Sequence, residues 1–264
     1  MPELYQFGWC FLRRVTHGVR HGSRADACCP SSTDCCPLSP ITMKKLERLE
    51  TATAPDGTVL TLYRHDGAYS IRVDGVELMS TRRHNSEDAL AELVCAPIRE
   101  RPGVRVLIGG LGLGFTLKAA LASLAQDARV VVAEIMAEVI TWNMNAEYGL
   151  SGDAMRDVRV EMRHADVAEV LERSQGQFDA IMLDVDNGAE PLTTSGNAYL
   201  YRDQGIRAAA NALRPNGRLA YWSANRDASF EESLRDASLS VEVIKTRAHS
   251  TSGAWHTLFI AGRV

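Results

Sequence analysis

From residue 105 onward, apolar strand-like segments alternate with helix-like segments, and this alternation limits the folds open to the chain. In chain order, strands and helices are expected by turns at 106–108, 115–125, 129–135, 137–148, 158–162, 167–173, 178–183, 204–213, 218–222 and 230–235. Strands this apolar have to be covered on both faces. The sequence therefore predicts an α/β fold with a parallel sheet and helices on both of its faces.

The chain ends differently from this alternating part. Two strand-like segments, 241–245 and 255–261, follow each other with a short turn at 250–253 and no helix between them. We expect them to form an antiparallel hairpin at one edge of the sheet. Such an ending favours a Rossmann-like sheet of the methyltransferase type over an ordinary dinucleotide-binding sheet.

A smaller module precedes the alternating part. Residues 58–63, 68–73 and 76–79 have the alternation of strands, and Asp74-Gly75 is a strong hairpin-turn signal. Ser86, followed by two acids, marks the start of a helix that runs to about Ala96. We therefore predict a small β-hairpin module with a linking helix at 43–98, followed by a larger domain at 99–264.

Residues 1–42 differ in composition from the rest. They contain five of the six cysteines and four of the nine prolines, without helix or strand periodicity. The pairs Cys28-Cys29 and Cys35-Cys36 are adjacent, whereas zinc ligands are usually separated by two to four residues. We expect a disordered N-terminal extension. An organelle transit peptide, or upstream sequence translated ahead of a start at Met43, remain alternatives.

Charge and hydropathy exclude two classes of protein. The net charge is −4 and the pI is about 6.0, which argues against a nucleic-acid-binding protein with a broad basic surface. No apolar stretch approaches the ~20 residues that cross a membrane. With a single cysteine, Cys95, after residue 42, the chain is expected to be cytoplasmic.

A glycine-rich segment, GGLGLG at 109–114, lies between the first strand and the first helix of the alternating part. Glycines allow a tight turn and a close approach of the backbone to a ligand. Phe115 stands where a hydride-cofactor loop would carry another glycine or alanine. Gly110, Gly112 and Gly114 therefore form the Gly-x-Gly-x-Gly pattern used to hold an adenosyl amino acid.

Acidic residues follow the next two strands. Glu134 ends the second strand, twenty residues after Gly114, at a position where an acid accepts the two ribose hydroxyls of a nucleoside. Asp166 follows the third strand, where an acid contacts the adenine amino group, and it could also simply cap the following helix. Together with the glycines, these acids predict a nucleoside site at the carboxyl edge of the sheet.

The fourth strand ends in Asp184-Val185-Asp186-Asn187-Gly188. Asp184 would face the sulfonium end of the ligand, where a carboxylate can orient an amine and accept its proton. Asp186 would favour a cationic substrate, although Asp186 and Asn187 could instead form a turn with Gly188. No metal is predicted, because His164 has no further ligand at a suitable spacing.

The order of these features resembles the spermidine synthase (polyamine aminopropyltransferase) family, which has the class I S-adenosylmethionine-dependent methyltransferase fold. The resemblance spans about residues 58–225 and is carried by Asp74-Gly75-Val76, the 109–114 loop, Glu134, Asp166 and Asp184. It implies decarboxylated S-adenosylmethionine as co-substrate, a small amine as acceptor, and frequently a homodimer. By this resemblance Glu134 holds the ribose, Asp166 holds the adenine, Asp184 is the catalytic acid-base residue, and Tyr199 or Tyr201 lies near the amine.

The chain departs from the family pattern on the acceptor side. Leu78 replaces a usual Gln, the Arg83-His84 and Glu87-Asp88-Ala89 segments replace an Asp-Glu pair and a Tyr-x-Glu element, and Asn187-Gly188 replaces Asp-Pro. We therefore consider three hypotheses. The first is transfer of an aminopropyl group to an amine. The others are S-adenosylmethionine-dependent methylation of a small molecule, and nucleoside binding by a non-catalytic homologue.

Overall fold

The computed structural model describes residues 45–185 and 195–263. Residues 43–264 group into one compact unit, and the described part of it contains two β-sheets. The predicted extension at 1–42 and the candidate residues Asp186 and Asn187 lie outside the described residues. The division of the chain at residues 42 and 98 stays a prediction.

The smaller sheet is antiparallel, with strand order β1-β2-β3-β4. Its strands are β1 Glu47–Thr53, β2 Val59–His65, β3 Ala68–Val73 and β4 Val76–Ser80. Asp74, with φ of 49°, and Gly75 make the turn expected between β3 and β4. Strand β1 was not predicted, because of its seven residues only Ala52 is buried and its sequence carries no apolar alternation.

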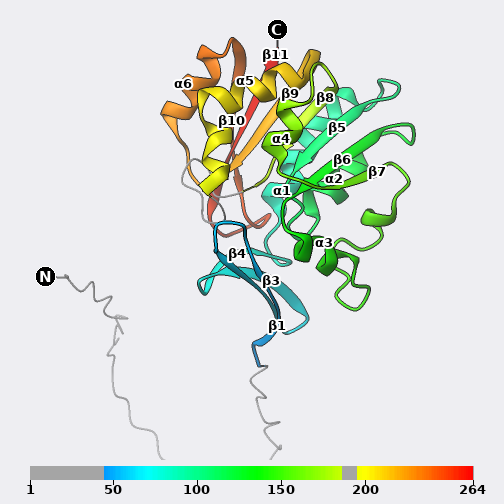
Figure 1. Cartoon of the computed structure of the whole chain (residues 1–264), viewed down its shortest axis with the longest axis vertical. Coiled ribbons are helices and arrows are strands. Elements are labelled where there is room, and N and C mark those ends of the chain that lie inside the picture. Colours follow the sequence, from blue (N-terminus) through cyan, green and yellow to red (C-terminus); the bar gives the residue numbers. More distant parts are fainter. Residues whose placement is uncertain (1–44, 186–194, 264) are drawn as a thin grey trace, which may run out of the picture. The chain divides into compact units, whose positions relative to one another are not determined.

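The larger sheet has seven strands in the order β10-β11-β9-β8-β5-β6-β7 (Figure 1). They are β5 Arg105–Gly109, β6 Arg129–Glu134, β7 Val160–His164, β8 Phe178–Leu183, β9 Leu213–Ser223, β10 Leu239–Arg247 and β11 Trp255–Arg263. Strands β5 to β9 pair in parallel, and β11 pairs antiparallel with both β9 and β10. The predicted Rossmann-like, methyltransferase-type sheet with an antiparallel edge hairpin is confirmed.

Helices cover both faces of this sheet because alternate strand residues point to opposite sides. Val106 and Ile108 pack in one apolar cluster with residues of α1 Asn85–Cys95, α2 Phe115–Ser123 and α3 Ala137–Met144. Leu107, between them, belongs to a second cluster. That cluster includes residues of α4 Val167–Glu172, α5 Asp203–Ala212 and α6 Ala228–Asp236.

The two sheets share part of their core. Leu60, Leu62 and Ile71 of the smaller sheet belong to the same apolar cluster as Leu90 of α1 and Leu117 of α2. Short 3₁₀ turns at Ala96–Ile98, Ala154–Arg156 and Ser195–Tyr201 complete the described elements. No helix in the described ranges is long and apolar enough to cross a membrane.

Three local expectations differ from the structure. Helix α1 begins at Asn85, so Ser86 lies inside its first turn and does not cap it. Strand β9 continues through Pro215-Asn216-Gly217, because the pairing with β8 shifts from Leu213 to Arg218 and this bulge accommodates the proline. Strand β7 starts two residues later than expected, at Val160. Arg159, just before it, is buried, and its guanidinium donates hydrogen bonds to Asp157 and to the Leu124 carbonyl.

Candidate functional site

The candidate site lies where the strand order reverses. Strand β5 stands between β6, which leads to one edge of the sheet, and β8, which leads to the other. In open α/β sheets ligands bind at such a switch point, outside the carboxyl ends of the strands. A cavity opens to solvent there. The space between its lining residues that protein atoms do not fill, open solvent included, is about 670 Å³.

The glycine loop after β5 forms one wall of this cavity. Gly110 has a φ of +88°, and a Cβ at this position would collide with the backbone carbonyl of Asp184. Gly112 has a φ of +51°, and a Cβ there would meet the side chain of Met79 at 2.7 Å. Gly110 combines left-handed backbone with a collision against backbone atoms, so only glycine fits there; at Gly112 the neighbour is the flexible end of Met79, and the left-handed backbone is what favours glycine.

Glu134 lines the cavity at the end of β6 and is 7% exposed. Its two carboxylate oxygens accept hydrogen bonds from the backbone N–H groups of Leu111 and Met136, both at 2.8 Å. Burial raises the pKa of this carboxyl, and the backbone hydrogen bonds oppose the rise. Glu134 thus braces the glycine loop from the wall of the cavity.

Asp166 also lines the cavity. Its Oδ1 accepts a hydrogen bond of 2.8 Å from the N–H of Ala168, and it is the N-cap of α4. The capping role considered from the sequence is therefore real. It occupies one carboxylate oxygen and is compatible with a contact from the other oxygen to a ligand.

Asp184 follows β8 and lines the same cavity. Its Oδ2 accepts a hydrogen bond of 2.7 Å from the hydroxyl of Thr116, the second residue of α2. Burial raises the pKa of Asp184 to about 6, against the opposing effect of the Thr116 hydrogen bond. Near neutral pH the carboxylate is the main form, and it is basic enough to accept a proton.

Glu87 is a second unusual carboxyl, which the sequence did not single out. It lies in the first turn of α1 and accepts a hydrogen bond from the hydroxyl of Ser86. Burial and then the negative charge of Asp184 raise the pKa of Glu87 to about 8. A first-turn acid is ordinarily a favourable partner for the helix dipole, so its sequence position alone hides this role. The one sign of this role in the sequence is that the Glu87-Asp88-Ala89 segment departs from the Tyr-x-Glu element of the family pattern.

The hydroxyls of Tyr199 and Tyr201, which are predicted to lie near the amine, both have partners within the protein. The Tyr199 hydroxyl donates to Glu172 of α4 at 2.8 Å. Tyr201 is buried among Tyr221 and Phe230, and its hydroxyl donates to the Trp222 carbonyl at 3.2 Å. Neither tyrosine is among the described residues that line the cavity. Their position near the amine stays a prediction.

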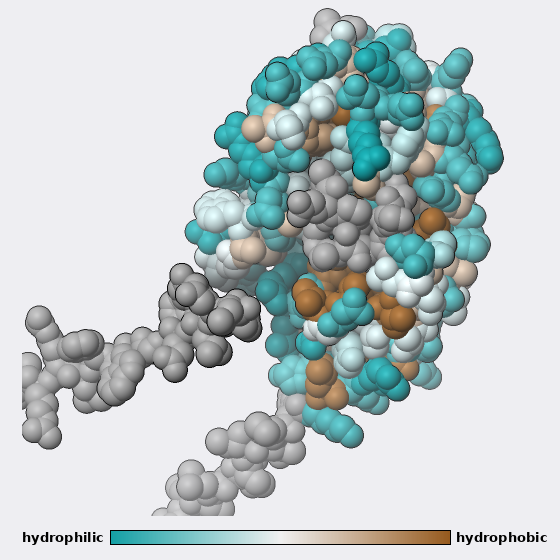
Figure 2. All heavy atoms as spheres, turned by 60° about the vertical axis from the view of Figure 1, so that its left-hand side comes forward, coloured by the Kyte–Doolittle hydropathy of each residue, from teal (hydrophilic) through white to brown (hydrophobic). Residues whose placement is uncertain are grey.

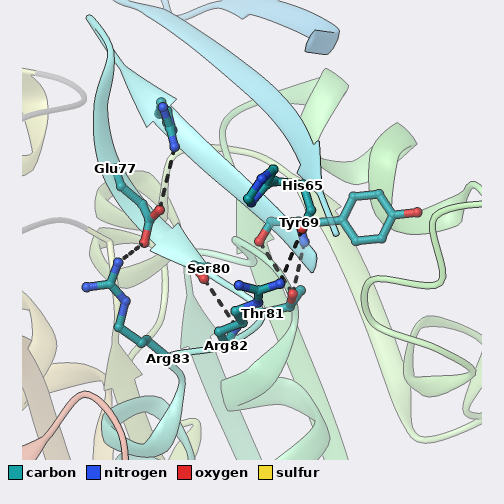
Figure 3. A network of polar contacts seen from close by, with 8 residues as sticks. His65, Tyr69, Glu77, Ser80, Thr81, Arg82 and Arg83 are labelled. Carbon is teal, nitrogen blue, oxygen red and sulfur yellow. Dashed lines mark hydrogen bonds and ion pairs between the residues drawn. The ribbon is translucent and has the colours of Figure 1, made fainter. Parts of the chain in front are cut away.

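The basic residues between the smaller sheet and α1 are engaged in holding the chain (Figure 3). Arg83 reaches Glu77 on β4, with 2.5 Å between guanidinium nitrogen and carboxylate oxygen. Arg82 donates to the carbonyls of His65 and Asp66 at 3.5 and 3.3 Å. These contacts fix the connection that leads from β4 into α1 and so help to position Glu87.

The charges along the cavity wall are all of one sign. Among the described lining residues the charged ones are Glu134, Asp166 and Asp184, with no Lys, Arg or His. Most others are apolar, including Leu60, Ile71, Leu78 and Met79 of the smaller sheet. The face shown in Figure 2 is largely hydrophilic, with hydrophobic residues gathered in its lower half. In the described part of the chain, no three His, Cys, Asp or Glu side chains are grouped so as to hold a metal ion.

The fold is an α/β sheet with a cavity at its switch point, and known structures share this fold. A spermidine synthase in complex with the transition-state analogue AdoDATO has a TM-score of 0.66 and 18% identity, covering 84% of this chain and 74% of that one. Spermidine synthase from Thermotoga maritima has a TM-score of 0.65 and 16% identity, covering 84% and 75%. A probable spermidine synthase from Corynebacterium glutamicum has a TM-score of 0.58 and 15% identity, covering 82% and 79%.

Sequence comparisons add nothing to these structures. No family model matches the chain, and no curated protein matches it. The chain is thus similar in fold to the spermidine synthases, as its motifs indicated, at an identity too low to carry over their activity.

Proposed function

We propose that this protein is a spermidine synthase-like transferase, which moves an aminopropyl group from decarboxylated S-adenosylmethionine to a small amine. The observation that carries the proposal is that one and the same cavity is lined by Gly110, Gly112, Glu134, Asp166 and Asp184. It unites a glycine loop, two acids suited to a nucleoside, and a third acid with a raised pKa. One structural neighbour, a spermidine synthase in complex with a transition-state analogue, supports the same choice.

The charge of the cavity wall favours the decarboxylated donor. S-adenosylmethionine carries a carboxylate, which would need a cationic or backbone partner. The described lining offers no cationic side chain, and the sequence of residues 186–194 contains no Lys, Arg or His. A donor with only a sulfonium and an amine, both positively charged, suits an acidic cavity better.

The proposed chemistry is an in-line displacement. An ammonium acceptor, with a pKa near 10 in water, gives one proton to Asp184 and becomes a neutral nucleophile. Its nitrogen forms a bond to the aminopropyl carbon while the bond from that carbon to sulfur breaks, leaving a neutral thioether. The acceptor must be bound in line with the carbon–sulfur bond, which is where a positioned carboxylate contributes most.

Calorimetric titration tests the donor. Decarboxylated S-adenosylmethionine and methylthioadenosine are expected to bind more tightly than S-adenosylmethionine, and incubation of the decarboxylated donor with a panel of amines should release methylthioadenosine. A preference for the carboxylated donor would instead favour a methyltransferase. Binding without product in every amine would indicate a non-catalytic homologue, and no binding by any nucleoside would overturn the site.

A further inference from the structure

A series of hydrogen bonds leads from Glu87 on α1 to strand β11 of the larger sheet. The Ser86 hydroxyl donates to Oε2 of Glu87, and its oxygen lies 2.9 Å from Nδ1 of His256 on β11. Ser86 is fully buried, whereas His256 is partly exposed. The three side chains thus connect Glu87, which is within the field of Asp184, with a partly exposed histidine.

The donors and acceptors of this chain depend on one another. A serine hydroxyl has a single hydrogen, so it can donate to only one of its two neighbours. While Ser86 donates to an ionised Glu87, His256 must carry hydrogen on Nδ1 and donate it to Ser86. When Glu87 is protonated it can donate to Ser86, which then donates to a bare Nδ1 of His256, and the histidine hydrogen resides on Nε2.

We propose that Glu87, Ser86 and His256 form a proton path that connects Glu87, a carboxyl within the field of Asp184, to the solvent. The proton of Glu87 passes to the Ser86 oxygen while the Ser86 hydrogen passes to Nδ1 of His256. The resulting imidazolium releases its Nε2 proton to water. One proton leaves Glu87, one reaches water, and His256 has changed its tautomer.

Neighbouring groups favour the last step, the release of the proton from His256 to water. Burial, and then the charge of Arg83, lower the pKa of His256, so its imidazolium readily gives up a proton. The edge-on contact with Trp222, at 4.6 Å between ring centroids, holds the imidazole plane. Asp184 and Asp88 are the charged groups whose fields reach Glu87. Two cationic side chains on adjoining elements lie over aromatic rings. Lys118 of α2 is 4.4 Å from the ring centroid of Phe115, and Arg247 of β10 is 4.1 Å from that of Trp255.

The use of this path rests on the proposed function. Near pH 7 the raised pKa of Glu87 keeps this carboxyl mostly protonated. The arrival of a sulfonium and an ammonium beside Asp184 would favour ionisation of both acids. Glu87 would then lose its proton through Ser86 and His256, which leaves Asp184 flanked by a second negative charge and better able to accept the acceptor's proton. Glu87 is therefore a positioning residue that acts through Asp184.

The tautomer of His256 can be measured on the ligand-free full chain by nitrogen NMR of ¹⁵N-labelled histidine, with His256→Gln identifying its signals. Between pH 7 and 9.5 the wild-type hydrogen should move from Nε2 to Nδ1, with a midpoint near pH 8. Glu87→Gln, whose amide donates permanently, should hold it on Nε2 throughout. Ser86→Ala should abolish the dependence, and Glu92→Gln, an exposed acid on the same helix, should leave the wild-type curve.

A wild-type tautomer that does not change over this range, or a Glu87→Gln variant that titrates like the wild type, overturns the path. If Glu87→Gln does not fold, Ser86→Ala decides in the same way. No donor or acceptor is present, so the outcome is independent of the proposed reaction. A tautomer change in a protein that binds no nucleoside would keep the path and remove the aminopropyl transfer.

Discussion

The fold raises the pKa values of two carboxyl groups, Asp184 and Glu87, and so disfavours their ionised forms. Asp184 and Glu87 have pKa values raised to about 6 and about 8, in both cases chiefly by burial. A buried acid without a cationic partner costs stability once ionised. Such a cost is usual for catalytic groups, whose proton affinity must match their task. The raised pKa values therefore support an acid-base role for Asp184 in the cavity.

Asp184→Asn is expected to lower kcat by about 10² to 10⁴-fold, the usual contribution of a positioned acid-base group. Asparagine keeps the shape and can still pair with Thr116, so the affinity for methylthioadenosine should stay within about twofold. Turnover is measured by release of methylthioadenosine, and affinity by calorimetry. Asp179→Asn, at the opposite end of β8 and paired with Arg214, is the control. Unchanged turnover in Asp184→Asn would exclude it from the reaction.

Stability should fall as the pH rises from 7 to 9. The folded-state pKa of Glu87, about 8, lies above the value near 4.3 of an unfolded glutamate. Between these two values the unfolded chain is ionised while the folded chain keeps its proton, so stability falls as the pH rises and levels off above about pH 8. The loss is about 1 kcal/mol over this range, measured by urea unfolding. Glu87→Gln should flatten the dependence, whereas Glu92→Gln should retain it.

At the scale of elements, the strand ends and the loops after them determine the site. Strands β5, β6 and β8 each deliver one component, because parallel neighbours end at the same edge. The glycine loop packs so closely that Gly110 meets the backbone after β8. The loop and the Asp184 segment therefore act as one rigid piece.

Gly110→Ala should destabilise this piece and abolish nucleoside binding. The variant combines the strain of a left-handed residue, about 1–2 kcal/mol, with a collision against the Asp184 carbonyl. Gly176→Ala is the matched control, since Gly176 has a φ of +56° and open space around its missing Cβ. Thermal unfolding and titration with methylthioadenosine separate the two. Equal destabilisation with binding retained in Gly110→Ala would contradict the close packing.

At the scale of the whole molecule, the acids and the apolar wall come from different parts of the chain. The larger sheet contributes the acidic edge, and the smaller sheet contributes Leu60, Ile71, Leu78 and Met79 to the same cavity. Both sheets lie within residues 43–264, which form one compact unit. The cavity therefore requires the two sheets to fold as a single body.

A chain that starts at Met43 is expected to unfold within about 2 °C of the full chain and to bind methylthioadenosine equally tightly. The physical reason is that every described residue of the cavity lies after residue 43. Differential scanning calorimetry and titration of both chains provide the measurement. A loss of binding in the shortened chain would assign residues 1–42 a part in the site.

Local patterns in the sequence determined much of this protein. Strand periodicity, turn signals and the GGLGLG segment predicted the parallel sheet and its edge hairpin. Since parallel strands end at a common edge, they also brought Glu134, Asp166 and Asp184 to one place. Those inferences succeed because each depends on a short stretch and on a topology with few alternatives.

Only the tertiary structure decided the acceptor side. Ser86 and His256 meet across 170 positions of sequence, and Glu87 comes under the charge of Asp184 from a helix nearly a hundred residues earlier. Tyr199 pairs with Glu172 of α4, and Tyr201 packs in the aromatic cluster around Phe230. Such contacts arise from the packing of distant segments, and no local pattern records which of them will touch.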